Sequence, residues 1–109
     1  MVIKVMFVKY CIDKILTGEK CVTRRLPRGR RPAVPGKIHK LKIDRTKKTY
    51  GSILIEECEL SLIKDIDDKE AQREGFSTRK EYIEYFMDIN DIDILNDWDL
   101  VWRVKFTLL

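Results

Sequence analysis

Histidine and closely spaced cysteines, the usual ligands of protein-bound metals, are scarce in this sequence. His39 is the only histidine, and the three cysteines, at positions 11, 21 and 58, show no Cys-x-x-Cys spacing. These counts exclude a four-ligand zinc site and a disulfide framework, so we expect three reduced thiols and neither a metal nor a cofactor. Cys11 and Cys58 fall at positions predicted to be buried in a helix and in a strand. We interpret His39 as a surface or half-buried strand residue without a catalytic role.

Long apolar runs are missing too. No stretch approaches the length of a membrane span, and the N-terminal MVIKVMFVKY is too short and too interrupted by lysine for a signal peptide. We therefore expect a cytoplasmic protein with no membrane partner. The 109 residues suit one domain, spanning 1–109, and the 44% apolar and 37% charged residues are typical of a folded chain with a thermophile-like composition.

Positive charge is present but unevenly distributed. Residues 1–49 hold fifteen Lys and Arg against three Asp and Glu, whereas residues 50–109 hold seven against fifteen. Such asymmetry indicates a polyanionic partner, or two halves that neutralise each other across the fold. Both interpretations stay open at this point.

The basic residues concentrate in GEKCVTRRLPRGRRP, residues 18–32, with one lysine and five arginines. Pro27, Gly29 and Pro32 break regular structure there, so the run lies partly on a loop. Three interpretations fit it: a patch for nucleic acid, a site where charge serves chemistry, and a solvated loop.

The remaining pattern predicts an α+β fold. Period-two alternation and β-branched residues indicate strands, with an extended segment over 20–25 as a further candidate. The predicted strands cover Val2–Val8, Lys37–Asp44, Gly51–Ile63 and Leu100–Leu108, and the second and third of these should pair antiparallel. We expect a small, partly closed β-barrel of about five to six mostly antiparallel strands with two to three helices.

Three helices are predicted from apolar spacing and capping signals. The first contains Ile12, Ile15 and Leu16 and ends before Gly18. The second and third begin at capping boxes, one formed by an aspartate three residues before Glu70 and the other by Thr78 and Glu81. In the third helix an apolar stripe is expected to face the core rather than stack on bases. The stripe consists of Tyr82, Tyr85, Phe86 and Ile89.

The stretch CIDKILTGEKCVTRRL resembles the signature of the ASCH family, in which a helix ending in glycine leads into Gly-x-Lys-x-x-Thr-x-Arg. Gly18, Lys20, Thr23 and Arg25 carry this motif. The downstream EAQREGF, TRKEYIEYF and WRVKF are similar to the family in content and order. The resemblance implies a PUA-like β-barrel with a cleft lined by the basic motif, in a superfamily associated with RNA and modified-nucleoside recognition.

One branch of that family, the small amidohydrolases that remove the acetyl group from N4-acetylcytidine, resembles this chain more specifically. The resemblance implies that Lys20, Thr23 and Glu74 are the catalytic residues. The chemistry is reasonable because a threonine hydroxyl becomes nucleophilic when a neighbouring base, such as a desolvated lysine, takes its proton. In an extended segment, however, positions 20 and 23 face opposite sides, so they converge only if the chain bends.

Glu74 and the arginines allow other interpretations. Glu74 lies in the last turn of its predicted helix, where it is a general acid, a surface residue, or a partner of Arg73 or a motif arginine. The arginines exceed what an uncharged nucleoside needs and suit phosphate.

The principal prediction is therefore an RNA- or nucleotide-binding domain, monomeric, with amidohydrolase activity and docking of an acidic protein as alternatives. The predicted binding residues are Lys20, Arg24, Arg25, Arg28, Arg30 and Arg31.

Overall fold

The structure, a computed structural model, describes residues 9–42 and 48–109. Its elements, in chain order, are α1 (Lys9–Leu16), β1 (Val22–Arg25), β2 (Ile38–Lys42), β3 (Thr49–Leu62), the 3-10 helix η1 (Ile63–Asp65), α2 (Asp68–Arg73), α3 (Arg79–Ile89) and β4 (Leu100–Leu108). The predicted strand Val2–Val8 lies outside the described residues, as do the last two positions of the predicted strand Lys37–Asp44.

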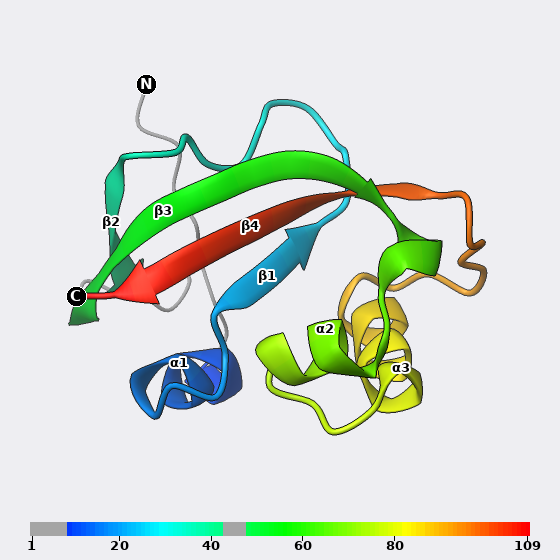
Figure 1. The fold of residues 1–109 in the computed structure, drawn as a ribbon, viewed down its shortest axis with the longest axis horizontal. Helices are drawn as coiled ribbons and strands as arrows, with labels where there is room; N and C mark the ends of the chain where they lie inside the picture. The colour runs from blue at the N-terminus through cyan, green and yellow to red at the C-terminus, as the bar shows by residue number, and fades with distance from the viewer. Residues whose placement is uncertain (1–8, 43–47) are drawn as a thin grey trace.

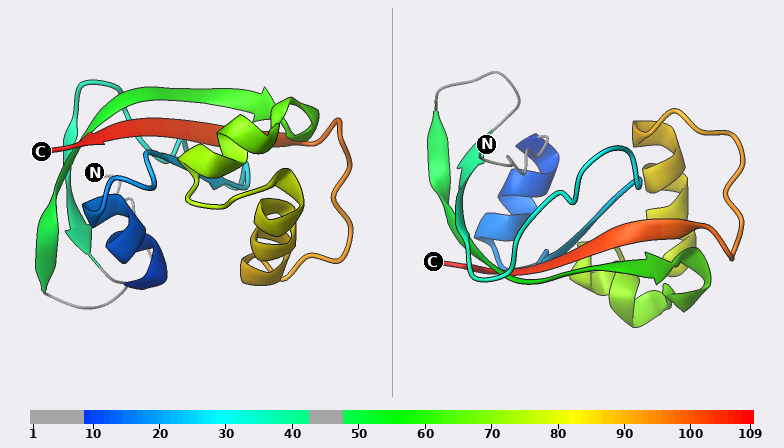
Figure 2. Two further views of the ribbon diagram at one scale, coloured as in Figure 1. Left: turned by 60° about the horizontal axis from the view of Figure 1, so that its bottom comes forward. Right: turned by 90° about the horizontal axis from the view of Figure 1, so that it is seen from above.

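The four described strands form one antiparallel sheet in the order β1-β4-β3-β2. The 14-residue β3 is long enough to curl, and a register shift between Ile55 and Glu57 interrupts its pairing with β4. The result is an α+β fold with a partly closed, half-barrel sheet, as predicted (Figure 1). Helix α1 lies near one end of the sheet, and α2 and α3 lie together near the other end (Figures 1 and 2).

Local sequence signals place the helices correctly. The side chain of Asp67 accepts the Glu70 amide at 2.8 Å, and that of Thr78 accepts the Glu81 amide at 3.3 Å, so both predicted N-caps are confirmed. The reciprocal half of a capping box is not formed in either of these described helices, because the Glu70 carboxylate pairs with arginines and the Glu81 carboxylate accepts the Ser77 amide. Gly18 follows α1 with a φ of 82°, a conformation that glycine adopts at little cost. None of the helices in the described part of the chain is long and apolar enough to cross a membrane.

Two apolar clusters form the core. The first joins α1 to the sheet, and the second joins α2 and α3 to Val101 at the start of β4. Tyr85 packs against both clusters, and β1 runs between α1 and the α2–α3 pair (Figure 1). This arrangement leaves an edge of the sheet, β1, facing α1 on one side and the α2–α3 pair on the other.

Candidate functional site

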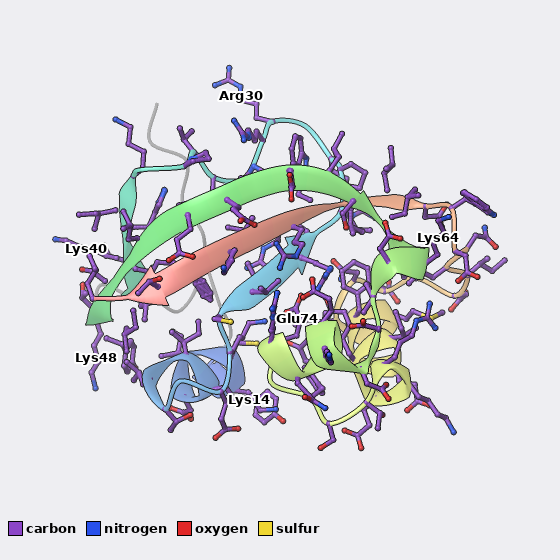
Figure 3. All side chains as sticks on the ribbon, viewed as in Figure 1. Lys14, Arg30, Lys40, Lys48, Lys64 and Glu74 are labelled. Atoms are coloured by element: carbon purple, nitrogen blue, oxygen red, sulfur yellow. The ribbon has the colours of Figure 1, made fainter. Side chains whose placement is uncertain are left out.

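A cleft of about 210 Å³ opens beside β1. The segment just before β1 and β1 itself supply four polar side chains to the cleft, and Glu74 enters it from the C-cap of α2. Helix α3 supplies the aromatic groups and α1 supplies a thiol. Its lining comprises Cys11, Lys20, Thr23, Arg24, Arg25, Glu74, Tyr82, Tyr85, Phe86, Ile89 and Asn90. Figure 3 shows Glu74 between the sheet and the helices, at the centre of the molecule.

Lys20 lies just before β1, where the chain bends out of the strand. Its backbone forms an isolated bridge with Glu74, its N–H donates to the Lys14 carbonyl at 3.1 Å, and the next N–H, of Cys21, donates to the Arg73 carbonyl at 2.8 Å. The side chain is buried, and Nζ donates to the Val22 carbonyl at 2.8 Å. The same Nζ forms an ion pair with Glu74 Oε1. The bend turns the lysine toward α2.

Glu74 is the C-cap residue of α2 and is 1% exposed. Its two carboxylate oxygens are divided between two cations: Oε1 accepts from Lys20, and Oε2 accepts from Arg24 Nη1 at 3.1 Å. Of the interpretations given above, pairing with a motif arginine is therefore confirmed, and a surface position is wrong. These ion pairs hold a carboxylate at a helix end where the helix dipole opposes it.

Thr23 is buried in β1, and its Oγ1 accepts a hydrogen bond from Arg25 Nη1. The sequence left open whether positions 20 and 23 meet, because alternation in a strand separates them. They line the same cleft because Lys20 precedes the strand, which begins at Val22. The three residues that the amidohydrolase resemblance implies, Lys20, Thr23 and Glu74, thus share one cleft.

Arg24 connects the cleft to a second, partly buried carboxylate. Its Nη2 donates to Glu70 Oε1 at 2.7 Å, and Arg103 Nε donates to the same oxygen at 2.6 Å. Burial alone raises the pKa of Glu70, but the hydrogen bonds from Arg103 and Arg24 outweigh it and hold that pKa below 4.5. Sequence reasoning identified Glu70 only as a capping residue and overlooked Arg103, which carries no local signal.

Tyr82, Tyr85 and Phe86 form the aromatic wall of the cleft. Tyr82 and Phe86 are buried in the second apolar cluster, as predicted for a core stripe, and Tyr85 is half-buried. For Ile89 the prediction is wrong: it is the last residue of α3, lies outside both apolar clusters and is 47% exposed. The Tyr85 hydroxyl lies 3.1 Å from Cys11 Sγ. Burial is the largest cause that raises the pKa values of both tyrosines, so their hydroxyls stay protonated and can donate hydrogen bonds.

The structure separates the arginines of the basic run into two groups. Arg24 and Arg25 line the cleft with Lys20, whereas Arg28, Arg30 and Arg31 do not. Arg31 Nη2 donates to the Cys58 carbonyl, and its guanidinium lies 5.9 Å from the centre of the Trp102 ring. Arg28 and Arg30 are exposed, and Figure 3 shows Arg30 across the sheet from Glu74.

Cysteine and histidine do not assemble into a further site. All three cysteines are free thiols, with Cys11 and Cys58 buried as predicted. In residues 9–42 and 48–109 no group of three or more His, Cys, Asp or Glu is placed to hold a metal ion. His39 lies in β2, away from the cleft lining, and is more buried than predicted, at 9% exposure. Burial lowers its pKa below 6.5.

The fold is similar to several solved structures. An ASCH domain from Lactobacillus crispatus matches with a TM-score of 0.67 and 18% identity, covering 91% of this chain and 70% of that chain. A DUF984-family protein from Enterococcus faecalis matches with a TM-score of 0.68 and 12% identity, covering 100% of this chain and 78% of that one. This chain has the ASCH fold. An ASCH protein from Zymomonas mobilis, solved as a mutant, matches with a TM-score of 0.61 and 19% identity, covering 96% of this chain and 65% of that one.

At the level of sequence, no family model matches the chain, and no curated protein matches it. The similarity to the ASCH structures, at 12–19% identity, concerns the fold. The fold that the motif Gly18, Lys20, Thr23 and Arg25 implies is therefore confirmed.

Proposed function

We propose that the cleft is the active site of an amidohydrolase that removes an acyl group from the exocyclic amine of a nucleoside, with N4-acetylcytidine as the representative substrate. One observation carries the proposal: Lys20, Thr23 and Glu74 line a single cleft although Glu74 is 54 positions from Lys20 in the chain. The ASCH-type motif and the resemblance to the amidohydrolases support the same assignment.

Each of the three residues has a chemical role in this proposal. Transfer of a proton from Lys20 to Glu74 within their ion pair leaves a neutral amine, which then takes the hydroxyl proton of Thr23. Oγ1 attacks the acyl carbon, and the electron pair of the carbonyl moves onto its oxygen. The hydrogen bond from Arg25 to Thr23 Oγ1 stabilises the negative charge that Oγ1 gains when it loses its proton.

Collapse of the tetrahedral intermediate completes the first half-reaction. The C–N bond breaks, and protonated Glu74 gives its proton to the departing nitrogen. Water then attacks the acyl-threonine ester and gives a proton to Glu74, which is again a carboxylate. Lys20, which carries the proton taken from Thr23, returns it to Oγ1 as the ester bond breaks. The net reaction consumes one amide and one water and releases an amine and a carboxylic acid.

Cleft size and charge favour a nucleoside over a polymer at this site. A volume of about 210 Å³ is below the usual range of ligand pockets, so it suits a single base rather than several nucleotides, and the aromatic wall provides an apolar face for that base. Glu74 and Glu70 neutralise much of the positive charge of Lys20 and Arg24, which leaves these cations less available for phosphate.

RNA binding is a second candidate, and a different surface favours it. Arg28 and Arg30 are exposed outside the cleft, next to Arg31 on the same loop. Exposed arginines bind phosphate oxygens bidentately without reading sequence. RNA would therefore bind this arginine loop, residues 28–31, rather than the cleft.

Incubation of the purified protein with N4-acetylcytidine and other N-acylated nucleosides tests the primary proposal. Chromatography should show the free amine accumulating with the parent protein and not with Lys20→Ala. Turnover that survives Lys20→Ala, or no turnover with any acylated nucleoside, would refute the enzymatic assignment.

A further inference from the structure

Lys14, on α1, contacts both segments that bring the site together, although it does not line the cleft. Its Nζ donates a hydrogen bond to the Gly75 carbonyl, and its own carbonyl accepts the Lys20 amide at 3.1 Å. Gly75 and Lys20 are, respectively, the neighbour and the ion-pair partner of Glu74. One residue therefore bridges the chain just before β1 and the chain just after α2.

The ammonium group of Lys14 is held by two aromatic rings. Nζ lies 4.4 Å from the centre of the Tyr10 ring and 4.3 Å from that of Phe76, distances typical of cation–π contacts. The Phe76 ring lies 4.8 Å from that of Tyr85, which forms part of the cleft wall. The contacts of Lys14 thus extend to the aromatic side of the cleft.

The absence of a side chain at Gly75 makes room for Lys14. It has a φ of 91°, and a Cβ atom built there would lie 2.6 Å from Lys14 Cδ. A side chain at position 75 would displace the lysine stem as well as strain the backbone. The position directly after Glu74 is therefore open to Lys14.

We propose that Lys14 is a positioning residue: it holds the Lys20 and Glu74 segments together so that their ion pair forms beside Thr23. This inference rests on the proposed function for its catalytic consequence. Whether Lys14 keeps the two segments paired can be measured without any substrate.

The substrate-free test is amide hydrogen exchange. In the parent, the Cys21 amide donates to the Arg73 carbonyl and so reports whether the two segments stay paired. Lys14→Met keeps the apolar stem but loses the hydrogen bond and the charge, and should lower the protection of the Cys21 amide by about tenfold or more. Lys14→Arg, which restores a cation and a donor, should recover most of it. Unchanged protection in Lys14→Met overturns the inference.

Lys64→Met is the matched control, because Lys64 also places an ammonium over an aromatic ring, at 4.1 Å from the centre of Trp98, and lies outside the cleft lining. It should leave Cys21 protection unchanged. If Lys14→Met does not fold, Tyr10→Leu is used instead, which removes only the half-exposed one of the two rings that contact the Lys14 ammonium. It should also lower the protection of the Cys21 amide, but by less than Lys14→Met.

The kinetic test separates positioning from simple stabilisation. Well below the melting temperature, Lys14→Met should lower kcat on N4-acetylcytidine by about tenfold to a hundredfold with little change in KM, since small displacements of reacting groups are costly. Lys14→Arg should restore kcat. A kcat equal to that of Lys64→Met would reduce Lys14 to a structural role. If the parent shows no turnover, the proposed function fails, and amide exchange still decides whether Lys14 holds the segments.

Discussion

The ammonium of Lys20 and the carboxylate of Glu74 form an ion pair in which the two side chains are 2% and 1% exposed. Arg24, whose side chain is 1% exposed, contacts the second oxygen of the same carboxylate. Two buried cations thus share one carboxylate directly. Such clusters are expensive to desolvate and add little net stability compared with apolar packing. Their placement in a cleft beside a threonine supports a chemical role.

The cluster contains two cations and one carboxylate, so neutralising the carboxylate should lower the free energy of unfolding more than neutralising one cation. Glu74→Gln leaves the two cations facing each other without their shared carboxylate, and should lower the free energy of unfolding by about 3–5 kcal/mol. Lys20→Met removes one cation and leaves Glu74 paired with Arg24, so it should cost less. Urea unfolding at neutral pH measures both changes. Equal losses in the two variants would contradict the assignment of Glu74 as the shared counter-ion.

Thr23 offers a cleaner test of catalysis because its hydroxyl is not part of the buried ion pairs. Thr23→Val keeps the shape of the side chain and removes Oγ1, so it should change stability by about 1 kcal/mol, the size of one lost hydrogen bond. Turnover of N4-acetylcytidine should fall by about a thousandfold or more, since a nucleophile acts with its base as a unit. Thr107→Val, at an exposed position on β4, is the matched control and should keep full activity. An active Thr23→Val variant would remove the covalent mechanism.

Local signals in the sequence predicted much of the scaffold. The capping residues Asp67 and Thr78 and the strand Leu100–Leu108 were placed correctly, because capping and alternation depend on neighbours in the chain. The antiparallel pairing of β2 with β3 was predicted from two consecutive strand patterns separated by a turn-like segment, and it is confirmed.

The electrostatics of the site could not be predicted in the same way. Arg24 belongs to a run of basic residues that suggests an exposed surface, but it is buried against Glu70 and Glu74. Those glutamates lie 46 and 50 positions away, so only the folded path of the chain brings them together. The same path places Arg30 on the other side of the sheet although it is six residues from Arg24 (Figure 3).

Glu70 should make stability depend on pH in the acid range. Its pKa in the folded protein lies below 4.5, so the unfolded chain takes up the proton first as the pH falls. The stabilisation from Arg103 and Arg24 is therefore complete above pH 4.5 and is lost as the pH falls through the folded-state pKa. Glu70→Gln should be less stable than the parent at neutral pH and should lose less stability on acidification.

Urea unfolding at about pH 7, about pH 5 and about pH 3 provides the measurement for Glu70. Glu84→Gln, an exposed carboxylate on α3, serves as the control and should follow the parent. If Glu70→Gln and the parent lose stability in parallel between the two extremes of pH, Glu70 is not the group responsible.

The arginine loop predicts a salt-dependent affinity for RNA that is independent of the cleft. Arg28→Ala combined with Arg30→Ala removes two exposed cations and leaves Arg31 on the Cys58 carbonyl, so the fold should be kept. Each phosphate contact on a single strand contributes about 0.7 to the slope of log affinity against log salt, so the slope should flatten by about one to two units. Fluorescence anisotropy with a labelled oligouridine, titrated at increasing salt, measures the change.

Lys69→Ala combined with Lys80→Ala is the control: it removes two exposed cations from α2 and α3 and should leave the slope unchanged. Equal slopes for the two double variants would show that the loop has no special role, and a loss of nucleoside hydrolysis in the arginine variant would show that loop and cleft do not act independently.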